Sequence, residues 1–351
     1  MDVLRPIISL ASRVALPMRI RNEVQLYSQL SKCRCRLGSA GLEFAPSHNN
    51  LGGSMKSVSI HTWMVGMFLG VLLATNPIGQ AAAGDDTEQA ALQADRSLLS
   101  ALGKADSKET GKLLDAEFAW TNSDGKLSKR AEVLDDLPAY AADNQGDENV
   151  QTHFYGQVET VLGVHHNARF LRIWVKRPAG WREFVELDTP MSARSAPASL
   201  EAAAGRGDCE NPCRTVPYKP TTAVDQAILA DWQKTKVEEW HPDAVDWPMH
   251  IADEFLIINN NGMRDKPERV AIAKKQQEAG VGAPGDPITA MEIHDFGDNA
   301  AVMISHHVPH RGGKPYYNVR VWTLRDGRWQ LAISQQSTIQ SAPAVPPSEA
   351  K

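Results

Sequence analysis

The stretch RVWTLRDGRWQL at residues 320–331 reads as a strand, a tight turn and a second strand. A closely similar phrase, RIWVKRPAGW, occupies residues 172–181. Self-similarity within a chain is the sequence signature of a repeated structural unit. The two phrases therefore predict that the chain contains two copies of one small domain.

Two further matches precede the hairpins in the same order. Residues 114–129, LDAEFAWTNSDGKLSK, parallel residues 251–266, IADEFLIINNNGMRDK, and both read as a strand, an Asx-Gly turn and a helix start. Residues 153–166, HFYGQVETVLGVHH, parallel residues 294–307, HDFGDNAAVMISHH. With a helix at the start of each copy, the predicted order is helix, short helix, strand, helix and then three or more antiparallel strands.

The penultimate strand of each copy has two different faces, because side chains alternate along a strand. One face is apolar and is predicted to pack: Leu171, Ile173 and Val175 in the first copy, with Val319, Val321 and Thr323 in the second. The opposite face mixes polar and aromatic side chains: Arg172 and Trp174 in the first copy, with Asn318, Arg320 and Trp322 in the second. That mixture is unlike an ordinary core.

Composition and charge limit the possible partners. The 351 residues, of which 42% are hydrophobic, suffice for two cores. The net charge is -5 and no long basic run is present. Because nucleic-acid binding requires clustered Lys and Arg, we exclude a nucleic-acid partner.

A leader-like segment spans residues 55–83. It has one lysine, an apolar run from Trp63 to Ala74 and three alanines before an acidic stretch, which is typical of a secretory signal peptide cut after Ala83. The apolar run is shorter than the ~20 residues of a membrane-spanning helix. We therefore expect a periplasmic or secreted protein that contacts the membrane only if this segment stays uncleaved.

Residues 1–54 precede this segment, although a signal peptide belongs at the start of a chain. If translation begins at Met55, they are a non-native or disordered extension. Their Arg-rich, acid-poor composition also fits an organelle transit sequence. We prefer the first interpretation.

Two cysteines, Cys209 and Cys213, follow the predicted cleavage site in the phrase CENPC. Without a neighbouring histidine they make a poor zinc site, so a local disulfide is expected in an exported protein, with two free thiols as the alternative. The segment around them is rich in Ala, Pro, Ser and Gly and reads as a linker. The expected organisation is a first domain at 86–190, a linker at 191–220, a second domain at 221–340 and a disordered tail at 341–351.

The repeated phrases, RVWTLRDGRWQ above all, resemble the nuclear transport factor 2-like superfamily and its SnoaL-like branch. The closing hairpin is also similar to that of the association domain of calcium/calmodulin-dependent kinase. The resemblance implies an α+β fold of two tandem cone-shaped domains, each a curved antiparallel sheet wrapped around about three helices and open at one end. The superfamily contains enzymes as well as proteins that only bind or oligomerise, so the fold alone does not fix the function.

The resemblance to the kinase association domain implies that Arg320 points into the cavity of the second domain, with His307 on the preceding strand. Matching of the strands completes the predicted ligand-binding set with His294, Asn318, Trp322 and Gln336. The equivalent residues of the first domain are His153, His166, Arg172, Trp174 and Asp188.

A buried arginine is costly unless a carboxylate meets it. Asp188 can supply that carboxylate in the first domain, whereas the second domain has Gln336 at the matching place. The predicted site is therefore in the second domain, where Arg320 would hold a small polar or carboxylate ligand beside histidines whose charge varies near neutral pH. A fully bonded polar network that lines a structural cavity is the alternative.

Three functional classes stay open. The chain is a ligand-binding protein, or an isomerase or dehydratase-type lyase with His307 or His294 as general base, or a non-catalytic oligomerisation module. In the last case the two copies form a pseudo-dimer, or the chain forms a homodimer. A metal set of His294, His307 and Glu292 is an alternative without a supporting motif, so we expect neither a metal nor another cofactor.

Overall fold

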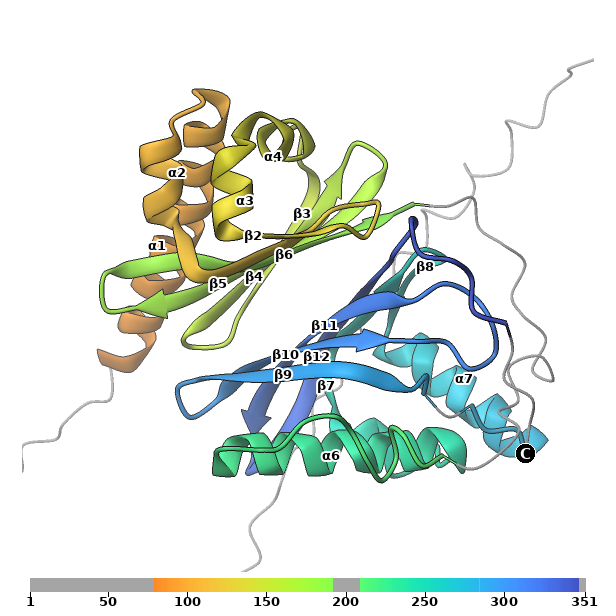
Figure 1. Cartoon of the computed structure of the whole chain (residues 1–351). Helices are drawn as coiled ribbons and strands as arrows, with labels where there is room; N and C mark the ends of the chain where they lie inside the picture. Colours follow the sequence, from red (N-terminus) through yellow and green to blue (C-terminus); the bar gives the residue numbers. More distant parts are fainter. Residues whose placement is uncertain (1–78, 192–208, 284, 347–351) are drawn as a thin grey trace, which may run out of the picture. The chain divides into compact units, whose positions relative to one another are not determined.

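The computed structural model of the chain describes residues 79–191, 209–283 and 285–346, with side chains from Thr87 onward (Figure 1). The predicted extension 1–54 and residues 55–78 of the predicted signal peptide lie outside the described residues. The same holds for residues 192–208 of the linker and 347–351 of the tail. Among the described residues, no helix has the length and apolarity needed to cross a membrane.

The first repeat, residues 79–191, has its helices on one face of a six-stranded sheet (Figure 1). Its helices are α1 (Gly79–Gly103), α2 (Ser107–Leu113), α3 (Arg130–Asp135) and α4 (Leu137–Asp143). Its strands are β1 (Leu114–Thr121), β2 (Leu127–Lys129), β3 (Glu148–Phe154), β4 (Val158–His165), β5 (Ala168–Arg177) and β6 (Gly180–Pro190). The strand order is β2-β1-β6-β5-β4-β3.

The second repeat, residues 209–346, has the same arrangement. Its helices are α6 (Ala223–Trp240), η1 (Trp247–His250) and α7 (Lys266–Ala279). Its strands are β7 (Ile251–Asn259), β8 (Gly262–Asp265), β9 (Ile288–Phe296), β10 (Ala300–His307), β11 (Tyr316–Arg325) and β12 (Arg328–Thr338), in the order β8-β7-β12-β11-β10-β9. The predicted α+β fold with two tandem copies is confirmed. The sheets are mixed instead of wholly antiparallel, because β1 and β7 each run parallel to the last strand of their repeat.

Side-chain caps define where the helices of the second repeat begin. At the start of α6, the Thr222 hydroxyl accepts a hydrogen bond from the Asp225 amide at 3.0 Å, and the Asp225 carboxylate accepts one from the Thr222 amide at 3.2 Å. The Asp265 carboxylate accepts the Glu268 amide at 2.9 Å at the start of α7. These caps satisfy amides that have no partner within the helix.

Strands β5 and β11 separate two environments, as the alternation of their residues predicts. Their apolar face joins one cluster that includes residues of both sheets, among them Leu171, Ile173, Val175, Val319 and Val321. The other face is directed toward the helices and is also buried, with Arg172, Trp174, Asn318, Arg320 and Trp322 on it. The polar side chains of this face are therefore enclosed inside each repeat.

The hairpin between β9 and β10 is one residue longer than the hairpin between β3 and β4. His294 pairs with Val302, eight residues further along, whereas His153 pairs with Thr160, seven residues further along. A gapless alignment of the two sequences is therefore wrong by one residue after this turn.

This one-residue offset changes the assignment of one histidine. His165 at the end of β4, and not His166, is the counterpart of His307 at the end of β10. His166 follows in the turn with φ 47°, and its imidazole lies 2.8 Å from the carbonyl oxygen of Ala142. The prediction that His166 occupies the equivalent position is wrong.

The CENPC segment contains a disulfide between Cys209 and Cys213, with Cα atoms 5.4 Å apart. The Asn211 side chain between them bonds both backbone groups of Ile288, at 2.9 Å each. The segment is thereby fixed to the start of β9. Pro212 of the same segment reaches the wall of the cavity described next.

Candidate ligand-binding cavity of the second repeat

A cavity of about 240 Å³ lies inside the second repeat. Its wall is formed by residues of α6, η1, α7, β7, β10, β11 and β12, together with the loop before β9. Sites for drug-sized ligands usually measure roughly 300–1,000 Å³. This cavity therefore suits a ligand of metabolite size.

Arg320 of β11 lies on the cavity wall and is 5% exposed. Its Nη1 donates to the Ser305 hydroxyl at 2.7 Å, and its Nη2 lies 3.5 Å from Nε2 of His307. Within the described ranges of the chain, no carboxylate forms an ion pair with it. Burial lowers the pKa of Arg320 to about 10, as expected for a guanidinium without an anionic partner.

His307 is buried beside Arg320. Its Nδ1 lies 3.0 Å from the carbonyl oxygen of Asp286, and its Nε2 lies 2.9 Å from the Ser305 hydroxyl. Burial and the charge of Arg320 lower the pKa of His307 to about 3. The imidazole is therefore neutral near physiological pH, and the expectation that its charge varies there is wrong.

Two further predicted residues lie on the cavity wall and one does not. Asn318 and Gln336 line the cavity, and the Asn318 amide donates to the Ser334 hydroxyl at 3.3 Å. Trp322 packs instead in an apolar cluster with Ile228 and other side chains of the second repeat. It contributes to the core and does not reach the cavity.

His294 lies on the opposite face of the sheet. Its neighbour Ile293 faces the helices, so alternation directs His294 away from them. The imidazole lies 3.3 Å from the Glu292 carboxylate and contacts the Phe184 ring at a centroid distance of 4.8 Å. His294 therefore joins neither a ligand site nor a metal set with His307, which corrects both interpretations.

Several charged residues of the cavity wall come from the helices and were missed by the sequence analysis. On α6, Nζ of Lys236 lies 2.6 Å from the Glu239 carboxylate. Arg269 of α7 lies 3.8 Å from the other oxygen of that carboxylate. The one available signal was the spacing of Lys236 and Glu239, which places both on one side of a helix. Nothing in the sequence pattern connected Arg269 to them.

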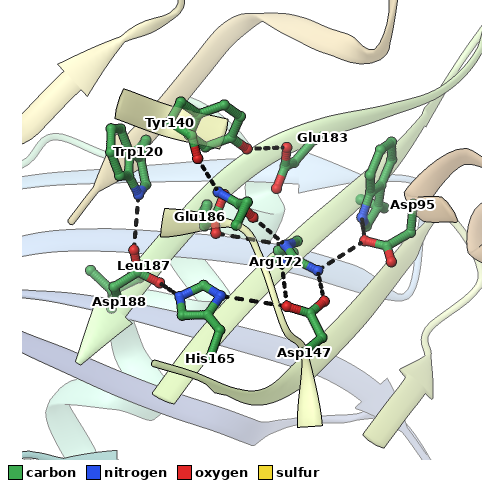
Figure 2. A network of polar contacts seen from close by, with 12 residues as sticks. Asp95, Trp120, Tyr140, Asp147, His165, Arg172, Glu183, Glu186, Leu187 and Asp188 are labelled. Atoms are coloured by element: carbon green, nitrogen blue, oxygen red, sulfur yellow. Dashed lines mark hydrogen bonds and ion pairs between the residues drawn. The ribbon is translucent and has the colours of Figure 1, made fainter. Parts of the chain in front are cut away.

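The matching interior of the first repeat contains a dense polar network (Figure 2). Arg172 is fully buried and donates two hydrogen bonds to the Asp147 carboxylate, at 2.7 and 3.1 Å. It also lies 3.6 Å from carboxylate oxygens of both Asp95 and Glu186. Arg172 is therefore neutralised, but by these acids and not by Asp188 as predicted.

Asp188 pairs with His165 instead. Its carboxylate lies 2.9 Å from Nε2 of His165 and accepts a hydrogen bond from the Trp120 indole at 3.0 Å. Burial alone would lower the pKa of His165, but Asp147 and Asp188 raise it to about 10. The first repeat thus holds a charged imidazole where the second holds a neutral one.

Of the remaining predicted residues of the first repeat, Trp174 joins the network around Arg172 through Asp95, and His153 does not. Trp174 is buried and donates to the Asp95 carboxylate at 3.1 Å. His153 on β3 stacks on Tyr155 at a centroid distance of 6.5 Å and takes no part in the network around Arg172.

One group of described residues has the composition of a metal-binding set. His165, Glu186 and Asp188 each place a possible ligand atom within 4.8 Å of the others. Nε2 of His165 is already bonded to Asp188, and Arg172 lies beside Glu186. These bonds account for the arrangement, so we assign no metal to it.

No protein-family model matches the chain, and no curated protein does. A nuclear transport factor 2-like protein of unknown function from Shewanella oneidensis is similar in structure, at 16% identity and TM-score 0.27, over 32% of this chain and 97% of its own. A nuclear transport factor 2-like protein with a cystatin-like fold from Novosphingobium aromaticivorans gives 14% identity and TM-score 0.30, over 36% and 96% of the two chains.

The association domain of C. elegans calcium/calmodulin-dependent protein kinase II is also similar, at 15% identity and TM-score 0.26, over 33% of this chain and 96% of its own. These are the protein classes that the repeated hairpin resembles. Each of the three similarities spans about a third of this chain.

Proposed function

We propose that the second repeat binds a small organic anion, in the first place a carboxylate, in its cavity. The observation that carries this proposal is the buried guanidinium of Arg320, which lines the cavity and has no ion pair with a carboxylate of the described residues. An uncompensated buried charge is costly, and a ligand carboxylate would remove that cost. Ser305 and His307 orient the guanidinium and leave N–H groups for a bidentate contact.

The isomerase or lyase alternative has weaker support. A general base works best when its pKa lies near the working pH. The pKa of His307 is lowered to about 3, and its Nε2 already faces Ser305 and Arg320. His294 lies on the other face of the sheet. Binding without turnover is therefore the function that we favour.

Export to the periplasm or the extracellular space is part of the same proposal. It is supported by the leader-like sequence that ends at Ala83. The disulfide between Cys209 and Cys213 also supports it, because disulfides persist in oxidising compartments. The apolar cluster shared by the two sheets supports a pseudo-dimer within one chain.

Thermal unfolding with a panel of small carboxylates tests the binding proposal. A carboxylate at about 100 times its Kd should stabilise the wild-type chain by about 2.7 kcal/mol. Arg320→Ala should abolish this rise in Tm, whereas Arg328→Ala, at an exposed position of the same repeat, should retain it. The proposal is contradicted if no carboxylate raises the Tm, or if Arg320→Ala responds as the wild type does.

A further inference from the structure

The cavity of the second repeat has more positive than negative charge on its wall. Its positively charged lining residues are Lys236, Arg269, Arg311 and Arg320, and its negatively charged lining residues are Glu239 and Asp286. Positively charged side chains therefore outnumber the carboxylates on this wall.

Arg269 of α7 shares its carboxylate partner with another cation. Its side chain is 16% exposed, and Glu239 is the carboxylate that lies within ion-pair distance of it in the described part of the chain. That carboxylate is bound more closely by Lys236, at 2.6 Å against 3.8 Å for Arg269. Asp286, the other acid of the wall, accepts a hydrogen bond from the Tyr316 hydroxyl. Arg269 thus shares a single carboxylate with Lys236 and is the more distant of the two cations.

Each of the two guanidiniums lies beside a tryptophan whose indole N–H has no hydrogen-bond partner among the described residues. Arg320 lies 5.4 Å from the ring centre of Trp232, and Arg269 lies 5.2 Å from that of Trp247. Both indoles are buried and line the cavity. Nε of Arg269 is a third buried donor without a partner.

Buried N–H groups are nearly always bonded to protein, water or ligand. The cavity therefore presents two separate donor groups, Arg320 with Trp232 and Arg269 with Trp247, and each of them includes at least one buried N–H group without an acceptor among the described residues. The two groups come from different elements, since Arg320 is on β11 and Arg269 is on α7. Two acceptors on one ligand match this arrangement better than a single anionic head does.

We infer that the ligand is a dicarboxylate, with one carboxylate bound by Arg320 and Trp232 and the other by Arg269 and Trp247. This inference rests on the proposed function of the same cavity. Apolar side chains on the wall, Ile251, Phe255 and Ile257, favour a hydrocarbon spacer between the two carboxylates.

Calorimetric titration of the full chain with matched acids tests the inference. Butyrate is compared with succinate, and hexanoate with adipate, because each pair differs only in the second carboxylate. The better dicarboxylate should bind about tenfold to hundredfold more tightly than its matched monocarboxylate, as expected for one additional charge-assisted contact. This comparison is made on the wild-type chain and does not depend on a variant.

Two variants then locate the second contact. Arg269→Gln should remove the advantage of the dicarboxylate, so that the ratio of its affinity to that of the matched monocarboxylate falls to within about twofold of one. Arg320→Gln should weaken the binding of both acids, and Arg328→Gln at an exposed position should change neither. Arg269→Lys, which keeps the charge, should retain part of the advantage and controls for a loss of folding.

The outcomes separate the inference from the proposed function. Equal affinities for matched mono- and dicarboxylates, both lost in Arg320→Gln, would overturn the inference and leave the proposed function intact. A dicarboxylate advantage that survives in Arg269→Gln would also overturn it, as would tighter binding of a phosphate monoester than of any dicarboxylate. Absence of binding by every acid tested would contradict the proposed function itself.

Discussion

The two repeats place an arginine at the same point of one fold and surround it in opposite ways. Arg172 is fully buried and bonds the Asp147 carboxylate at 2.7 Å, with two further acids nearby. Arg320 is buried almost as deeply, but within the described residues it bonds only neutral groups. A repeated fold therefore does not imply a repeated site, because the charge of the surrounding side chains decides what the arginine does.

Part of the difference lies on the last strand of each repeat. Strand register makes the following residues counterparts: Glu183 and Leu331, Glu186 and Ser334, Asp188 and Gln336. All three acids of the first repeat are replaced by uncharged residues in the second. Together with Asp147 and Asp95, these acids fill the interior of the first repeat. The second repeat keeps a cavity beside a guanidinium that forms no ion pair with a carboxylate of the described residues.

The largest difference between the repeats is expected in the free energy of unfolding when the arginine of each is replaced. Arg172→Met removes the cation from buried Asp95 and Glu186 and from partly buried Asp147, and should lower the free energy of unfolding by about 3–5 kcal/mol. Arg320→Met removes a charge that no protein anion compensates, and should change the stability of the ligand-free chain by less than about 1 kcal/mol. Urea unfolding at neutral pH measures both. Equal destabilisation by the two variants would contradict the comparison.

A smaller effect is expected when the second repeat is converted toward the first. Ser334 pairs with Arg320 across β11 and β12, so Ser334→Glu places a carboxylate where the first repeat has Glu186. This internal anion should neutralise Arg320 and weaken carboxylate binding by about tenfold to hundredfold. Ser334→Gln is the matched neutral control, and calorimetric titration gives the affinities. If Ser334→Glu bound carboxylates as tightly as Ser334→Gln, Arg320 would not be the anion-binding group.

The smallest effect concerns pH. The pKa of His307 is lowered to about 3 and that of its counterpart His165 is raised to about 10, so neither imidazole changes charge between pH 6 and pH 8. Arg320, whose pKa is lowered to about 10, also keeps its proton in that range. The Kd for a carboxylate should therefore vary by less than about twofold between pH 6 and pH 8. It should rise only as the pH passes through the pKa of Arg320.

Titrations of a carboxylate into the protein at pH 6, 7 and 8 measure this dependence. Affinity about tenfold weaker at pH 8 than at pH 6 would indicate a histidine that binds the ligand in its charged form. The assignment of His307 as a neutral residue would then be wrong.

The fold was predictable from the sequence because its signals are local and occur twice. The apolar face of Leu171 and Ile173 on β5 follows from alternation alone, and so does the position of Arg172 and Arg320 on the other face. That this other face is enclosed was implied by the family resemblance. The repeated hairpin supplied the order of the elements. The strand faces and the order of the elements do not depend on which loops lie close together.

The details of the site were less predictable because they depend on loop length and on distant segments. One additional residue in the turn after β9 was enough to misassign His166, and His294 was placed on the wrong face. Asp147 lies in the segment before β3, and no pattern in the sequence linked it to Arg172. Arg269 reaches the cavity from a helix whose spacing gave no reason to expect a functional role.

The two-faced character of β11 and β12 has an evolutionary consequence. Consecutive residues of a strand serve opposite sides of the sheet, so Ile333 belongs to the apolar cluster while Ser334 lies on the wall of the cavity. Selection can therefore alter ligand specificity at alternate positions without disturbing the packing that holds the domain together. After a gene duplication, one copy can therefore keep its interior residues while those of the other copy change.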